Sequence, residues 1–152
     1  MKLGRNTSID SITSSVPGLV PQISNYLTRK RYWEAIIFVD HLSSYILVSI
    51  QEDQTTKTMI DSKSEYELHA ASQVVNFIAY HAENGRFLNA SFQDDVLQKN
   101  QEIRYCGVGA HHQNGIAERQ IKQLIEMART YPENFIHLWP SSISSELVSS
   151  IL

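Results

Sequence analysis

Continuous apolar runs mark the centre of the fold that this chain is expected to form. Residues 32–39 contain the run AIIFV without alternation, as is typical of a strand buried on both faces. A short polar stretch at residues 41–44 separates this run from a second β-prone run at residues 45–50. Together the two runs predict a β-hairpin.

Shorter strands and helices are expected to alternate along the rest of the chain. Three further strands are expected, at residues 6–12, 74–80 and 103–106. Three helices are expected, at residues 55–72, 90–100 and 114–130. Residues 13–30 are rich in Ser, Pro, Gly and Asn and predict an irregular connection. This order of elements predicts an α/β fold with a mixed sheet.

The helix expected at residues 114–130 has the clearest pattern. Its apolar residues fall on one helical face, and Asn114 is a suitable N-cap residue. Apolar residues recur at helical spacing again within residues 141–152, where the pattern ends without a stop signal. We therefore expect a truncated helix at 141–152, after a main unit formed by residues 1–140.

Composition narrows the class of protein. The chain has 152 residues, 42% hydrophobic and 19% charged, which fits one globular domain. Without a membrane-spanning apolar run or a signal peptide, no membrane partner is expected. A single cysteine, Cys106, suits a reducing compartment, cytoplasmic or nuclear. The net charge of −3 argues against nucleic-acid binding, for which a basic balance is usual.

Three acidic residues occupy positions that favour metal chemistry. Asp10 lies in the first expected strand, Glu83 precedes the turn Asn84-Gly85, and Glu118 begins the clearest helix. Carboxylates at strand ends and on an adjoining helix can converge, and like charges held close together need a cation. Mg²⁺ or Mn²⁺ meets that need. Two such ions about 3.5–4 Å apart support phosphodiester chemistry.

Four segments carry a resemblance to a known family. GVGAHHQNGIAERQIKQL (107–124) resembles the integrase signature in which a Gln-Asn-Gly turn precedes the helix with the catalytic Glu. YHAENGRF (80–87) resembles the segment with the second catalytic Asp, and FVDHLSSY (38–45) resembles the second strand and its turn. SIDSITSSVPGLVPQ (8–22) resembles the first-strand region of copia-like elements. The resemblance is to the catalytic core of a retroviral-type integrase from a copia-type LTR retrotransposon.

The resemblance implies an RNase H-like fold, a five-stranded mixed sheet flanked by helices, with residues 1–140 as the catalytic core. It implies DNA integration by 3′-processing and strand transfer at a two-metal site with Mg²⁺ or Mn²⁺. The implied partners are DNA, as element ends and target, and further copies of the chain.

Carried over by position, the resemblance makes Asp10, Glu83 and Glu118 the catalytic residues and metal ligands. Asp40 competes with Asp10 for the first position; we prefer Asp10 and expect Asp40 to form an Asx-type turn with Ser43 or Ser44. The family has Asp where this chain has Glu83, so we expect impaired catalysis. The expected DNA contacts are Asn114, Arg119, Lys122 and His112.

Other functions remain open at this point. A zinc site formed by His81, Cys106, His111 and His112 matches no tetrahedral spacing. A thiol hydrolase using Cys106 and His111 lacks a nucleophile motif. The main alternative is a catalytically dead retrotransposon fragment that keeps the fold and weak nucleic-acid binding. A simple metal-dependent nuclease of the same fold is a third reading.

Overall fold

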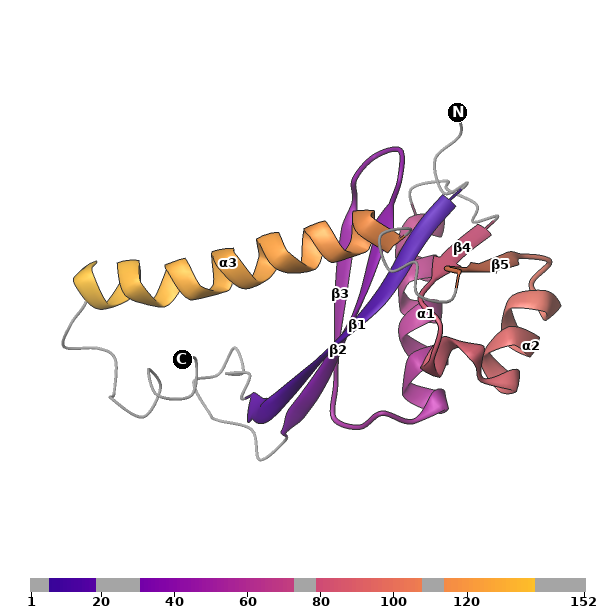
Figure 1. The fold of residues 1–152 in the computed structure, drawn as a ribbon, viewed down its shortest axis with the longest axis horizontal. Helices are drawn as coiled ribbons and strands as arrows, with labels where there is room; N and C mark the ends of the chain where they lie inside the picture. The colour runs from indigo at the N-terminus through magenta and orange to yellow at the C-terminus, as the bar shows by residue number, and fades with distance from the viewer. Residues whose placement is uncertain (1–5, 19–30, 73–78, 108–113, 139–152) are drawn as a thin grey trace.

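The computed structural model describes residues 6–18, 31–72, 79–107 and 114–138. Five strands form one sheet in the order β3-β2-β1-β4-β5 (Figure 1). The strands are β1 (Asn6–Gly18), β2 (Tyr32–Asp40), β3 (Ile46–Gln51), β4 (Ala79–Ala82) and β5 (Glu102–Tyr105). The helices are α1 (Thr56–Ala71), the 3₁₀ turn η1 (Arg86–Leu88), α2 (Ala90–Gln98) and α3 (Gly115–Leu138).

The sheet is mixed, as the sequence predicted. β2 pairs antiparallel with both β1 and β3, which confirms the expected hairpin. β4 lies parallel to β1 and β5. The sheet therefore combines an antiparallel half and a parallel half, and β1 is the strand where they meet.

Helices cover both faces of the sheet. One face carries the main core, in which Ile9, Ile36 and Phe38 pack with side chains of α1 and α2. Ile37 and Val39 alternate with these residues along β2 and are also buried, so the opposite face is covered as well. α3 contacts β1 and β2, and Figure 1 shows it crossing the sheet opposite α1 and projecting beyond the strands.

The first strand is longer than its sequence predicts. β1 continues through Gly18, so the irregular connection expected from residue 13 is wrong for residues 13–18. Pairing with β2 explains the difference: Thr13 lies opposite Glu34 and, after an irregularity, Gly18 lies opposite Tyr32. Ladder hydrogen bonds stabilise an extended backbone whose local sequence favours turns.

The other elements follow the predictions with small shifts. α1 begins after Thr55, whose hydroxyl caps the helix by accepting a hydrogen bond from the Thr58 amide. α3 continues beyond residue 130 to Leu138. Residues 19–30, 73–78 and 139–152 lie outside the described part, and with them most of the strand expected at 74–80 and the helix expected at 141–152. No helix in the described ranges is long and apolar enough to cross a membrane.

Candidate active site

Asp10 lies on the face of β1 that α3 covers. Its neighbours Thr7 and Ile9 point the other way: the Thr7 hydroxyl lies 3.4 Å from that of Tyr66 on α1, and Ile9 is in the main core. Because side chains alternate along a strand, Ser8 and Asp10 point towards α3. Asp10 is 6% exposed, and its Oδ1 accepts a hydrogen bond of 2.8 Å from the Ser11 amide.

Glu83 lies at the same end of the parallel ladder as Asp10. The last pair of β1 and β4 joins Ile9 to Ala82. Asp10 and Glu83 are the residues that directly follow Ile9 and Ala82 in the chain. Glu83 is half-buried. Both carboxylates therefore lie at one end of the parallel half of the sheet.

Glu118 approaches from α3. The first turn of this helix is held on β1 by Asn114, whose Nδ2 donates a hydrogen bond of 3.2 Å to the carbonyl of Ile9, next to Asp10. Ala117 is fully buried beneath the same turn, whereas Glu118 is exposed. The positive end of the helix dipole also favours a charged carboxylate in this first turn.

The Cys106 thiol is affected by the charges of all three carboxylates. The Cys106 amide donates a hydrogen bond of 3.1 Å to the carbonyl of Ala82. Its own carbonyl accepts a hydrogen bond of 2.6 Å from Nδ2 of Asn84. Burial raises the pKa of the Cys106 thiol, and the negative charges of three carboxylates raise it further. In decreasing order of effect, these are Glu83, Asp10 and Glu118. Three acidic side chains, from β1, from the residue that follows β4 and from α3, thus act on one buried group.

The carboxylates gather without closing on one point. Across residues 6–18, 31–72, 79–107 and 114–138, no three Asp, Glu, His or Cys side chains could hold a metal ion. Three carboxylates are nevertheless the donor set that Mg²⁺ and Mn²⁺ prefer. The chemistry of the donors fits such an ion, although the three carboxylates do not form a metal-binding group in this conformation.

Asp40 has a different role from Asp10. Its Oδ2 accepts hydrogen bonds from the Leu42 amide at 3.2 Å and from the Ser43 amide and hydroxyl, both at 2.7 Å. This is the Asx-type turn that the sequence predicted, and Ser43 is the partner. Asp40 lies two residues after Phe38 on β2, so the two side chains point to the same face of the sheet. Phe38 is a core residue of the α1 face. Asp40 therefore lies on the opposite face of the sheet from Asp10.

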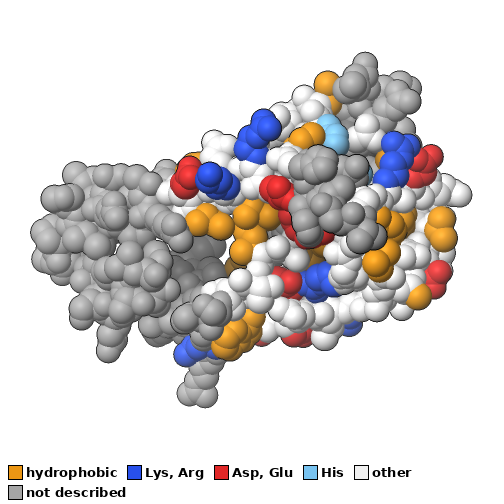
Figure 2. Space-filling model, viewed as in Figure 1, with side chains coloured by type: hydrophobic (Ala, Val, Ile, Leu, Met, Phe, Trp, Pro, Cys, Tyr) orange, Lys and Arg blue, Asp and Glu red, His pale blue; other side chains and the backbone are white. Residues whose placement is uncertain are grey.

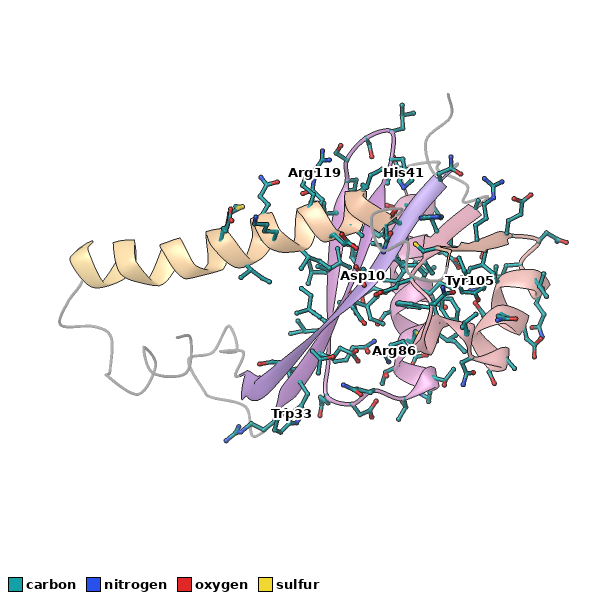
Figure 3. All side chains as sticks on the ribbon, viewed as in Figure 1. Asp10, Trp33, His41, Arg86, Tyr105 and Arg119 are labelled. Carbon is teal, nitrogen blue, oxygen red and sulfur yellow. The ribbon has the colours of Figure 1, made fainter. Side chains whose placement is uncertain are left out.

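The residues expected to contact DNA are only partly described. Arg119 and Lys122 are exposed on α3, and Figure 3 shows Arg119 on the first turns of that helix, with Asp10 on β1 and His41 just beyond β2. Asn114 is 1% exposed and links α3 to β1. The structure therefore assigns it a packing contact; the N-cap expected there is not seen, since its Oδ1 accepts no hydrogen bond within the described part. His112 lies outside the described residues.

Charge on this side of the molecule is mixed. Figure 2 shows Lys and Arg side chains scattered over the visible face, with Asp and Glu among them. A continuous basic stripe would be the usual footprint of DNA. The net charge of −3 agrees with this mixed distribution.

His41 and His81 lie close to each other, and the sequence did not predict this pair. The Nε2 of His41 lies 2.8 Å from the Ser8 hydroxyl, and Ser8 is the register partner of His81 on β4. Burial and the charge of His81 lower the pKa of His41, and Asp40 opposes them. The pairing of β1 with both β2 and β4 brings them together, and no local sequence signal marks the parallel pairing with β4.

The alternative sites on Cys106 gain no support. The raised pKa of its thiol favours the protonated form, which is neither a good nucleophile nor a good zinc ligand. His111 and His112, the other ligands considered, lie outside the described residues.

Sequence comparison finds no match: no protein-family model fits the chain, and no curated protein matches it. Solved structures do match. The chain aligns over 99% of its length with a chain of the simian T-cell lymphotropic virus intasome in complex with PP2A regulatory subunit B56 gamma, with a TM-score of 0.64 and 16% identity. It spans 47% of that chain.

The HTLV-2 integrase catalytic core domain in complex with magnesium gives similar alignments. Its dimeric form matches with a TM-score of 0.60 at 15% identity, covering 99% of this chain and 86% of the other. Its trimeric form matches with a TM-score of 0.58 at 16% identity, covering 99% and 82%.

The sheet order and the helices on its two faces define an RNase H-like α/β domain, the predicted fold class. Within that class, the chain has the fold of a retroviral integrase catalytic core. The assignment to copia-type retrotransposons stays a prediction.

Proposed function

We propose that this chain is a metal-dependent polynucleotidyl transferase that performs 3′-processing and strand transfer on DNA ends, and that Glu83 impairs it. The observation that carries the proposal is the gathering of Asp10, Glu83 and Glu118 around Cys106. These are the three positions at which the integrase resemblance expects metal ligands. The fold shared with integrase cores supports the same reading.

Each residue has a part in the proposed site. Asp10, Glu83 and Glu118 would hold Mg²⁺ or Mn²⁺, which when bound activates water or a DNA 3′-hydroxyl and stabilises the leaving oxygen. Asn114 fixes the first turn of α3 against β1. Arg119 and Lys122 are exposed near that turn and would contact DNA phosphates, and His112 would approach the same DNA.

Glutamate at position 83 is expected to impair the site for a geometric reason. Its side chain is one methylene longer than the aspartate of the family, so its oxygens move by about a bond length. A misplacement near 1 Å can reduce a rate on the order of 100-fold, and Mg²⁺ tolerates a distorted octahedron poorly. The described carboxylates form no metal-binding group, which agrees with this expectation.

The proposed partners are DNA and further copies of the chain. One structure with this fold is an intasome chain, and another is a dimeric form of an integrase core. Action on DNA by an integrase of this kind would take place in the nucleus or cytoplasm.

Restoring the aspartate tests the proposal. Mn²⁺-dependent cleavage and strand transfer on a donor DNA are measured for the wild-type chain, for Glu83→Asp and for Glu83→Asp with Glu118→Gln. We expect Glu83→Asp to gain roughly 100-fold and Glu118→Gln to abolish the gain. Cleavage without joining would instead identify a metal-dependent nuclease.

A second candidate is a non-catalytic descendant that keeps the fold and binds nucleic acid weakly. The observation that favours it is the failure of the described carboxylates to form a metal-binding group. It predicts no turnover from Glu83→Asp despite an unchanged fold, together with weak, salt-sensitive DNA binding.

A further inference from the structure

A polar groove of about 410 Å³ lies between the end of β3 and the first half of α1, apart from the candidate active site. Four carboxylates line it: Glu52, Asp53, Asp61 and Glu65. No lysine or arginine is among its lining residues. The groove is therefore a concentration of negative charge that a cation would relieve.

Gln51 supplies an unsatisfied acceptor in this groove. Only 3% of the residue is exposed, and its Nε2 donates to the Thr58 carbonyl at 2.9 Å and to the Ser62 hydroxyl at 2.7 Å. Its Oε1 accepts no hydrogen bond within the described part of the chain. A buried acceptor without a donor is costly, and a ligand N–H group that entered the groove and reached Oε1 would remove that cost.

Two of the four carboxylates, Asp61 and Glu65, make few of the hydrogen bonds that they could accept, whereas Oδ1 of Asp53 already accepts hydrogen bonds from Thr55 and Thr58. Asp61 forms an ion pair of 2.9 Å with Lys57 on the exposed surface of α1. Glu65 accepts a hydrogen bond of 3.1 Å from the Ser49 hydroxyl. An ionised carboxylate has about four acceptor positions. Each of these side chains can therefore accept further hydrogen bonds from a ligand.

The spacing of the acceptors favours an organic cation. No three acidic groups in the described ranges, which include every lining residue, could hold a metal ion. A guanidinium group carries five N–H donors in a planar fork and can reach separated acceptors. Tyr32, which also lines the groove, offers a ring on which a guanidinium can stack.

The position of β3 indicates how the cation would be presented. β3 is the outermost strand on its side of the sheet, and its residues Ser49, Ile50 and Gln51 line the groove. The backbone groups of an edge strand can pair with an extended peptide. We propose that the groove binds an arginine side chain of an extended partner segment that pairs with the edge of β3.

Peptide binding tests this assignment, which does not depend on the proposed function. The probe is a fluorescein-labelled seven-residue Thr/Val peptide with arginine at its centre, measured by fluorescence polarisation. Its matched control carries citrulline, the neutral analogue of arginine. We expect the arginine peptide to bind about tenfold more tightly than the citrulline peptide, with binding that weakens as salt rises.

Variants locate the binding site. Glu52→Gln with Glu65→Gln neutralises two lining residues and keeps their shape, so we expect binding about tenfold weaker. Asp94→Asn removes one exposed charge on α2, outside the groove, and should leave binding unchanged. Circular dichroism checks that both variants fold.

Five results would overturn the proposal. Equal binding of the two peptides removes the role of the guanidinium, and full binding by the double variant removes the groove. Agmatine that competes as strongly as the peptide indicates a small cation, and displacement by Mn²⁺ indicates a metal site. The fifth result is self-association of the chain. If the double variant abolishes this self-association and the peptide does not compete with it, the occupant of the groove is a second copy of the chain.

Discussion

The ammonium group of Lys63 lies 2.7 Å from a carboxylate oxygen of Asp95, so a fully buried cation joins α1 to α2. Lys63 also lies 2.7 Å from Glu67 on its own helix and 5.3 Å from the centre of the Tyr80 ring on β4. Lys99 pairs with Glu67 at 2.8 Å and with Asp95 at 3.4 Å. This network connects three elements of the α1 side of the domain.

Removing the buried cation should destabilise the domain. The substitution Lys63→Met keeps much of the side-chain volume but removes the ammonium group. Glu67 and Asp95, both largely buried, then keep their ion pairs with Lys99. We expect the free energy of unfolding to fall by about 2–3 kcal/mol, measured by urea denaturation, because a buried pair that loses one partner is strongly destabilised.

Lys57→Met provides the matched control. Lys57 pairs with Asp61 on the same helix, but its side chain is 84% exposed. Exposed pairs contribute about 0–1 kcal/mol, so the variant should unfold at nearly the wild-type urea concentration. Equal losses in the two variants would show that burial does not set the strength of the Lys63 network.

Acid should weaken the same network through Glu67. Burial raises the pKa of Glu67, but hydrogen bonds from Lys63, Lys99 and Tyr80, joined by Gln101, outweigh it and lower the pKa from 4.5 to about 2. The folded-state pKa is depressed, so the stabilisation is present above about pH 4.5 and is lost as pH falls towards 2.

Urea titrations of the wild type and of Glu67→Gln across that pH range measure this effect. The wild type should lose on the order of 3 kcal/mol more than the variant on acidification. Parallel pH profiles for the two proteins would contradict the role of Glu67.

The fold was predictable where local pattern and burial agree. The run that forms β2 is apolar without alternation, and its residues 36–40 are buried. The length of β1 was not predictable, because residues 13–18 are extended through pairing with β2 and not through their own preferences. Tertiary hydrogen bonds overrode a turn-rich sequence there.

The candidate site was predictable as a set of residues but not as a geometry. The motifs singled out Asp10 and Glu83, and the parallel pairing of β1 with β4, which puts both residues at one end of the ladder, is a long-range property. The burial of Asn114 was missed for the same reason, because its partner, Ile9, lies in another element. The groove at β3 depends on how α1 packs against that strand, and a short stretch of sequence does not predict this packing.

The two candidates for the first acid can be separated by mutation. Asp40→Ala removes three hydrogen bonds from the β2–β3 turn, so we expect a loss of about 1–3 kcal/mol in stability. Asp10→Ala should leave the turn intact and relieve repulsion among the carboxylates. In the Glu83→Asp background, we expect Asp10→Ala to abolish Mn²⁺-dependent strand transfer and Asp40→Ala to retain it once folded. The reverse result would exchange their roles.

Asn114 should position Glu118 relative to Asp10. Asn114→Ala removes the hydrogen bond to Ile9, and we expect a loss of about 1 kcal/mol in unfolding free energy. In the Glu83→Asp background, strand transfer should fall about tenfold or more, since small displacements of a catalytic group are costly. Gln123→Ala, at an exposed position of α3, should change neither quantity. A stability loss without an activity loss would limit Asn114 to packing.

The unequal lengths of the strands have a consequence for how the molecule opens. β1 has β4 as a neighbour only from Asn6 to Ile9, whereas its pairing with β2 continues to Thr13 and, past an irregularity, to Gly18. β3 pairs with β2 no further than Glu34. Beyond Glu34, β1 and β2 therefore form a two-stranded ribbon, a marginal structure by itself. Amide protons should exchange with solvent in a gradient along this ladder, fastest near Tyr32 and slowest near Phe38, because the ribbon can fray while the sheet stays closed.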